Sequence, residues 1–195
     1  MSKRGKICTG IGWLLLAAAL FLAVYNLWSD VKAGKTADTV LEQLMPEIEE
    51  EESYIPNSEM DMPEKEIDGQ KYIGVLQIPA LSLELPIISE WSYPNLKIAP
   101  CRYTGSAYQN NLVIAAHNYS SHFGRLKNLS PGDEVTFTDV DGNVFRYEVA
   151  ELETLSPFSI EEMTDSDWDL TLFTCTVGGQ SRVTLRCMII SRTHI

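Results

Sequence analysis

The chain has few basic residues, and this shortage already excludes one class of protein. Lys and Arg together number 15 against 27 Asp and Glu, which gives a formal net charge of −12. A nucleic-acid-binding domain needs a basic face, so the balance argues against nucleic acid as a partner. The sequence also has no repeat at a fixed period, which excludes solenoids and propellers. Its 195 residues suit one domain of ordinary size with an N-terminal extension.

Cysteine is scarce as well. The four cysteines, Cys8, Cys101, Cys175 and Cys187, are too few for a fold built on disulfides. No CxxC pair or His/Cys cluster has the spacing of zinc ligands, so we predict no metal and no cofactor. Cys8 lies in an apolar run, and the odd number that remains favours a free thiol. Whether Cys101 and Cys187 pair is left open, because the sequence does not set their distance.

The first 30 residues have the pattern of a membrane anchor. The run from residue 7 to residue 28 is almost uncharged and is long enough to cross a bilayer as a helix. Lys3, Arg4 and Lys6 precede it, which predicts a cytoplasmic N-terminus and an extracellular remainder. A signal peptide cleaved near Ala17–Ala19 is the alternative, but it would leave an apolar new N-terminus. We therefore expect a single-pass protein of the cell membrane.

Residues 31–70 are predicted to form an acidic extracellular tether. Five glutamates fall between residues 47 and 52, and a charge run of this kind repels itself and cannot bury a core. A short helix over 31–45 is expected just after the anchor. The rest should be extended or disordered, which gives the following domain reach without fixing its orientation.

Residues 71–195 are predicted to be an all-β domain. Short apolar segments alternate with turn signals rich in Pro, Gly and Asn, a pattern typical of a mostly antiparallel barrel or sandwich. Asp141-Gly142 predicts a hairpin with a tight primed turn. A short helix is expected over 120–129.

Three residues at the ends of predicted strands form a candidate catalytic set. His117 follows the apolar segment NLVIAA, and Cys175 ends the segment TLFTC. Arg182 opens the last strand, and the short turn between it and Cys175 predicts that the two residues are neighbours in a hairpin. His117 is far away in sequence and can join them only through the fold.

The three side chains have complementary chemistry for acyl transfer. The thiolate of a cysteine attacks carbonyl groups. An arginine is permanently cationic and stabilises a thiolate or an oxyanion. A histidine exchanges a proton with a leaving or an incoming amine. Taken alone, a strand cysteine is more often a buried hydrophobe, which is how we interpret Cys101 and Cys187. His122 and His194 are likewise interpreted as structural.

Four segments, in order, resemble the sortase family. TLFTC followed by Arg182 resembles its TLxTC…R pattern, and NLVIAAHNY resembles its histidine strand. FGRLKNLSPGDEV and YIGVLQIPALSLELPI resemble the segments after that histidine and at the start of the domain. The resemblance covers residues 71–195, and the anchor and tether match the layout of the family.

The resemblance implies a sortase-type eight-stranded β-barrel with one or two short helices, and a cysteine transpeptidase. Cys175 would cleave an LPxTG-like sorting motif near the C-terminus of a secreted protein through a thioester. His117 would protonate the leaving amine, and Arg182 would hold the substrate and the oxyanion. Thr174 would assist substrate binding. A peptidoglycan cross-bridge amine or a pilin lysine would then accept the acyl group.

Some alternatives remain open at this stage. The class is undecided between a class B-like and an unclassified sortase. The stretch from Phe158 to Trp168 is shorter than in class B, whereas PCRYTGSAYQNNLVIAAHNY looks more like class B than class A. The acidic residues in that stretch are interpreted as a solvated face rather than a calcium site. A peptide hydrolase with the same three residues, or a catalytically silent wall-binding or assembly module, is the rival function.

Overall fold

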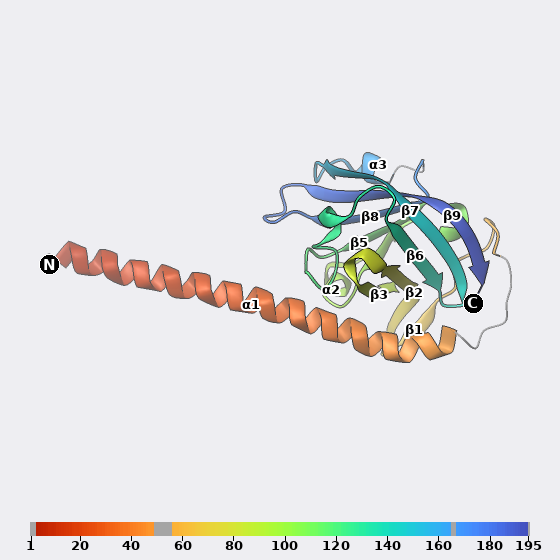
Figure 1. The fold of residues 1–195 in the computed structure, drawn as a ribbon. Coiled ribbons are helices and arrows are strands. Elements are labelled where there is room, and N and C mark those ends of the chain that lie inside the picture. Colours follow the sequence, from red (N-terminus) through yellow and green to blue (C-terminus); the bar gives the residue numbers. More distant parts are fainter. Residues whose placement is uncertain (1–2, 49–55, 165–166, 195) are drawn as a thin grey trace. The chain divides into compact units, whose positions relative to one another are not determined.

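The computed structural model describes residues 3–48, 56–164 and 167–194. The chain divides into two compact units, Met1–Lys32 and Ala33–Ile195 (Figure 1). The described residues of the first unit are helical and belong to helix α1 (Lys3–Ile48). The second holds the last turns of α1 and the whole sheet.

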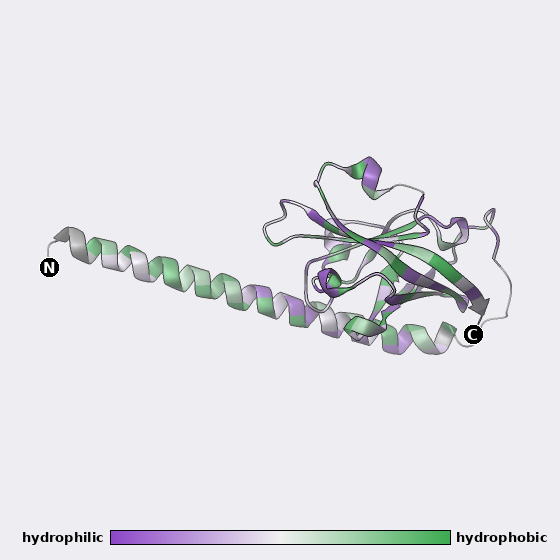
Figure 2. Cartoon of the chain, turned by 45° about the horizontal axis from the view of Figure 1, so that its top comes forward, coloured by the Kyte–Doolittle hydropathy of each residue, from purple (hydrophilic) through white to green (hydrophobic). Residues whose placement is uncertain are grey.

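Helix α1 contains a segment that is long and apolar enough to cross a membrane. Its large apolar side chains from Ile7 to Trp28 are exposed to the surroundings. Figure 2 shows the hydrophobic colouring that runs along this part of the helix. In water such a surface is unfavourable, whereas lipid tails would cover it.

The described residues of the second unit form a nine-stranded sheet that closes on itself. The strands are β1 (Lys65–Ile67), β2 (Gln70–Ile78), β3 (Leu83–Ile88), β4 (Cys101–Thr104), β5 (Leu112–Ala116), β6 (Glu134–Asp139), β7 (Asn143–Leu155), β8 (Leu170–Cys175) and β9 (Arg182–His194). Their order is β1-β2-β3-β4-β5-β8-β9-β7-β6, and β6 also pairs with β2. Strands β2 to β9 therefore form a ring, with β1 as an extra strand on β2.

The ring closes where β2 meets β6, and Gly74 permits this contact. Gly74 is the register partner of Asp139 and has φ of 151°. A Cβ atom at this position would lie 2.1 Å from the carbonyl oxygen of Thr138. No larger residue fits there without separating the two strands, so closure of the sheet depends on this glycine.

Two buried clusters lie on the two faces of the sheet. Strand β8 illustrates the alternation: Leu170 and Leu172 belong to one cluster, whereas Phe173 belongs to the other. Side chains alternate between faces along a strand, so Phe173 and Cys175 share a face. On that second face also lie α2 (Tyr93–Leu96) and α3 (Ile160–Met163), each a single turn of helix.

The segment after residue 32 is helical, as predicted for residues 31–45, but it also packs against the core, which the tether prediction did not include. Residues 33–48 are helical, and five of them are buried, namely Ala33, Ala37, Val40, Leu44 and Ile48. Their spacing places them on one helical face, which packs against both core clusters. Further on, Met62 is also buried in the core. The glutamates at 49–52 lie outside the described residues.

Two local predictions need correction. The hairpin of β6 and β7 is confirmed, but its turn is not a tight primed one. Gly142 has φ of 81°, whereas Asp141 is not in the left-handed region, and Val140 lengthens the connection. The short helix expected over 120–129 is only a 3₁₀ turn, Leu126–Asn128.

Candidate active site

Three adjacent strands bring the candidate catalytic residues together. Strand β8 lies between β5 and β9 in the sheet. The parallel pairing of β5 with β8 aligns Ala116 with Thr174, so His117 leaves β5 beside Cys175. In the β8–β9 hairpin, Cys175 and Arg182 are register partners, which confirms their predicted adjacency. The cysteine thus lies on the central strand of the three.

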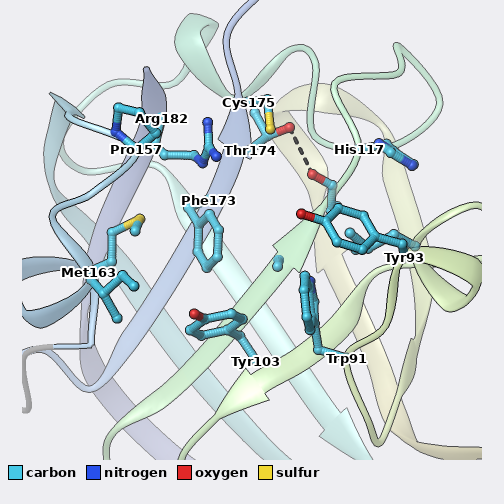
Figure 3. Close-up of a pocket in the computed structure, with 14 residues that line it drawn as sticks. Trp91, Tyr93, Tyr103, His117, Pro157, Met163, Phe173, Thr174, Cys175 and Arg182 are labelled. Carbon is cyan, nitrogen blue, oxygen red and sulfur yellow. Dashed lines mark hydrogen bonds between the residues drawn. The ribbon is translucent and has the colours of Figure 1, made fainter. Parts of the chain in front are cut away.

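These residues border one end of a pocket of about 230 Å³. Figure 3 shows Cys175 at the top of the pocket, with Arg182 on one side and His117 on the other. The lining residues come from four stretches of the chain, 91–103, 115–117, 157–163 and 173–182. They are Trp91, Tyr93, Leu96, Tyr103, Ala115, Ala116, His117, Pro157, Ile160, Met163, Phe173, Thr174, Cys175 and Arg182. Most of these side chains are apolar, so below the three polar residues the cavity favours an apolar ligand group.

Aromatic rings form much of the pocket wall, and the sequence analysis did not identify them. Trp91 contacts Tyr93 and Tyr103 edge-on, with ring centroids 5.1 and 5.7 Å apart. Tyr103 contacts Phe173 in the same way at 5.3 Å. Contacts of this geometry hold large rings in place. Phe173 was detectable in principle, because it stands two positions before Cys175 on the same face of the strand.

Cys175 differs from the other two cysteines of this unit in its exposure. Cys175 is partly exposed at the pocket, whereas Cys101 and Cys187 are buried, and all are free thiols. Burial raises the pKa of Cys101 to about 12 and the pKa of Cys187 even further. Cys101 and Cys187 belong to different core clusters and remain unreactive at neutral pH.

His117 is held in a partly buried position at the end of β5. Burial lowers the pKa of its imidazole, and the nearby cation Lys97 lowers it further. The backbone N–H of Phe123 donates to the carbonyl oxygen of His117 at 3.3 Å. The ring of Tyr119 lies 4.9 Å from that of His117, measured between centroids. At neutral pH the imidazole is therefore mainly uncharged and able to accept a proton.

The turn between β8 and β9 fixes Arg182. The Nη1 group of Arg182 donates to the carbonyl oxygens of Gly179 and Ser181, at 3.2 and 3.1 Å. The turn itself is closed by Thr176, whose N–H donates to the carbonyl oxygen of Ser181 at 2.9 Å. These hydrogen bonds within the turn hold the guanidinium of Arg182 at the edge of the pocket.

Thr174 holds two strands of the site together. Its side chain is buried, and its hydroxyl donates to the carbonyl oxygen of Ala116 at 2.9 Å. This bond joins the residue before Cys175 to the residue before His117. In the described structure the hydroxyl thus contacts the backbone, and its contact with substrate stays a prediction.

Among the described side chains, that of His122 does not line the pocket. His122 is buried, and its ring contacts Tyr119 at 5.6 Å between centroids. His194 ends β9, and its side chain lies outside the described residues. The α3 glutamates Glu161 and Glu162 are exposed to solvent.

Comparison with known proteins gives a consistent result. A family model described as Sortase domain matches residues 76–193. The chain is 28% identical to Sortase A of Bacillus anthracis over 137 residues, which are 64% of this chain and 65% of that relative. The chain therefore spans less than two thirds of the length of this curated relative.

Solved structures of similar fold come from several bacteria. A Sortase D5 transpeptidase of Clostridium perfringens is 21% identical, with a TM-score of 0.58 over 80% of this chain and 97% of that one. Sortase C of Streptococcus pneumoniae is also 21% identical, with a TM-score of 0.56 over 86% of this chain and 91% of that one. Relatives of different named classes match about equally, so the likeness shows the fold rather than a class.

Proposed function

This chain belongs to the sortase family, and from that premise we propose that it is a membrane-anchored cysteine transpeptidase. It would cleave an LPxTG-like sorting motif of a secreted protein and join that protein to an amine. The observation that carries the proposal is the position of Cys175, a partly exposed thiol between His117 and Arg182 at the end of an apolar pocket.

The first half of the reaction forms a thioester. The sulfur of Cys175 attacks the carbonyl carbon of the scissile peptide bond, and the thiol proton passes to the neutral imidazole of His117. Arg182 stabilises the negative charge that develops on the carbonyl oxygen. The C–N bond then breaks, and His117 returns the proton to the leaving amine.

The second half transfers the acyl group to a new amine. The amine of a peptidoglycan cross-bridge or of a pilin lysine attacks the thioester carbonyl, and His117 accepts the proton that this amine loses. The C–S bond breaks, His117 passes that proton to the leaving sulfur, and the thiol of Cys175 is regenerated. No oxidant or metal is consumed, since one amide is exchanged for another. The apolar pocket supports the proposal because it accommodates the apolar part of a sorting motif while the polar residues meet the scissile bond.

The N-terminal helix supports the proposed location. Residues 7–28 would span the cell membrane, with the basic tip in the cytoplasm and the catalytic domain outside. Secreted substrates and lipid-linked wall precursors are both found at that surface, so an anchored enzyme meets them there. Residues 1–30 are the proposed tip and anchor, and the catalytic domain follows the acidic segment.

The test uses the full chain in detergent micelles with LPxTG-like and NPxTG-like peptides, with and without amine acceptors. Mass spectrometry should detect a thioester on Cys175 and an amide-joined product, and both should be absent in Cys175→Ala. Cys8→Ala is the matched control, because it also removes a free thiol but lies in helix α1, away from the pocket. Cleavage without joining would indicate the hydrolase instead. No cleavage and no adduct over a broad peptide library would favour the silent module.

A further inference from the structure

One wall of the pocket is formed by the connection between β7 and β8. Pro157, Ile160 and Met163 from this connection line the cavity. Figure 3 shows Pro157 and Met163 on the side opposite Trp91 and Tyr93. The width of the pocket therefore depends on where the α3 segment, defined here as residues 156–164, lies against the sheet.

The α3 segment has little structure that could fix its own position. Its helix is a single turn, and the backbone hydrogen bonds of its described residues close within the segment itself, from Ser159 to Thr164. A helix this short is not stable alone in water. Its position must come from contacts with the sheet.

Arg186 supplies those contacts. Its Nη2 donates to the carbonyl oxygen of Glu162 at 2.5 Å, and its Nη1 donates to that of Met163 at 3.4 Å. Two carbonyl groups at the end of α3 are thereby bound to a side chain of strand β9. Met163 itself lines the pocket, so the hydrogen bond from Arg186 to its carbonyl oxygen acts directly on a residue of the pocket wall.

The sheet holds the same guanidinium on its other side. Nε of Arg186 donates to Oε1 of Glu153 on β7 at 2.6 Å, and Nη1 donates to the hydroxyl of Thr171 on β8 at 3.0 Å. Arg186 is the register partner of Thr171 and is only 2% exposed. A planar, permanently charged fork with several donors suits this position, and a lysine could not reproduce the geometry.

Arg186 also projects from the same face of the sheet as Phe173 and Cys175. It stands four residues after Arg182 on β9, so both project to the same face. Arg182 borders the pocket, whereas Arg186 is covered by the α3 segment. On the same face of β9, Arg182 therefore lies at the cavity, whereas Arg186 binds the segment that forms the cavity wall.

We propose that Arg186 is a positioning residue that fixes the α3 segment as a wall of the peptide groove and so sets which apolar side chain fits between Met163 and Phe173. This inference rests on the proposed peptide substrate. Arg186 does not touch the reacting atoms, so its loss should weaken peptide binding and leave the chemical steps at Cys175 nearly unchanged.

The kinetic test compares Arg186→Lys and Arg186→Met with the parent, as full chains in detergent micelles. We expect KM for the best peptide to rise at least about fivefold, with kcat within about twofold, because uniform binding is lost. Discrimination between peptides with a large and a small apolar residue in the motif should fall in parallel. The matched control is Arg146→Met, which removes an arginine from an exposed pair with Glu134 on the same sheet and should change neither constant.

A second readout does not depend on turnover. A glutamate-specific protease should cut after Glu161 or Glu162 at least about tenfold faster in the Arg186 variants, since the α3 segment is released from the sheet. Alkylation of Cys175 by iodoacetamide without peptide should stay within about twofold of the parent. If Arg186→Met fails to fold, Glu153→Gln, which keeps an acceptor on a partly exposed side chain, should still raise KM about two- to threefold.

The outcomes separate the two proposals. A fall in kcat with unchanged KM, or protease cleavage at the parent rate in folded variants, would overturn the role of Arg186. A parent chain that processes no peptide would refute the proposed function alone, and the protease experiment would still decide the role of Arg186.

Discussion

The helical segment 33–48 should contribute measurably to the stability of the catalytic unit, and Leu44 tests this most directly. Leu44 is 0% exposed and packs in the core cluster with Ile48 and Tyr72. Replacing it with alanine removes three carbon atoms, each worth about 0.8 kcal/mol of transfer free energy, and leaves a cavity. Together these give an expected loss of about 3 kcal/mol in the free energy of unfolding.

The assay is urea and thermal unfolding of a soluble fragment, residues 30–195, which contains the whole second compact unit. For a domain of this size, a loss of about 3 kcal/mol lowers Tm by roughly 6–12 °C. Gln43→Ala is the matched control, because Gln43 is the exposed neighbour on the same helix and its loss should change stability by no more than about 0.5 kcal/mol.

The reasoning is refuted if Leu44→Ala unfolds within about 0.5 kcal/mol of the parent, since the segment would then behave as a detachable tether. The result also has a practical side. A fragment that begins at Lys71 lacks the segment altogether, and we expect it to be markedly less stable than one that begins at residue 30.

Three further predictions concern the site and the sheet. The imidazole of His117 should titrate below its ordinary value of 6.5 in NMR spectra. Because the unfolded state then binds the proton more readily, the free energy of unfolding should fall as pH drops through the window from 6.5 to the lower folded pKa. The fall should be smaller in His117→Asn. An NMR titration midpoint of His117 above 6.5 would contradict this prediction. Cys101, with a pKa of about 12, should react with iodoacetamide at pH 7.5 more than about a thousandfold slower than a free peptide cysteine, until the chain is unfolded. Fast labelling of the folded chain would disprove its burial. Gly74→Ala should lower Tm well beyond Gly69→Ala, because both glycines have positive φ but only a Cβ at Gly74 collides with a neighbouring strand. Equal losses would mean that the β2–β6 contact tolerates a side chain.

The sequence was sufficient to predict seven of the nine described strands, all except β1 and β4, and the juxtaposition of Cys175 with Arg182. Both follow from local patterns: an apolar segment ends at the cysteine, and a turn too short for anything but a hairpin leads to the arginine. The position of His117 beside them did not follow from spacing. Strand β5 pairs with β8 in parallel, a long-range contact that the resemblance implied and the structure describes.

The packing of residues 33–48 could have been predicted from the spacing of their apolar residues, but the neighbouring charges drew the interpretation toward a solvated tether. Ala33, Ala37, Val40, Leu44 and Ile48 recur at helical spacing, but the glutamates that follow dominated the interpretation of the whole segment. The role of Arg186 had no such signal. Its partners come from β7, β8 and the α3 segment, and only the folded structure shows that they meet.

The order of strands also bears on when the chain acquires its reactivity. Cys175 and His117 come from strands whose pairing spans 58 residues, and the sheet closes only when β2 finds β6. Long-range pairings of this kind form slowly, typically over milliseconds to seconds. Under the proposed topology, a chain that crosses the membrane unfolded carries Cys175 without His117 and Arg182 beside it. Under the proposed function, such a chain can act on proteins exported beside it only after the ring of strands has closed.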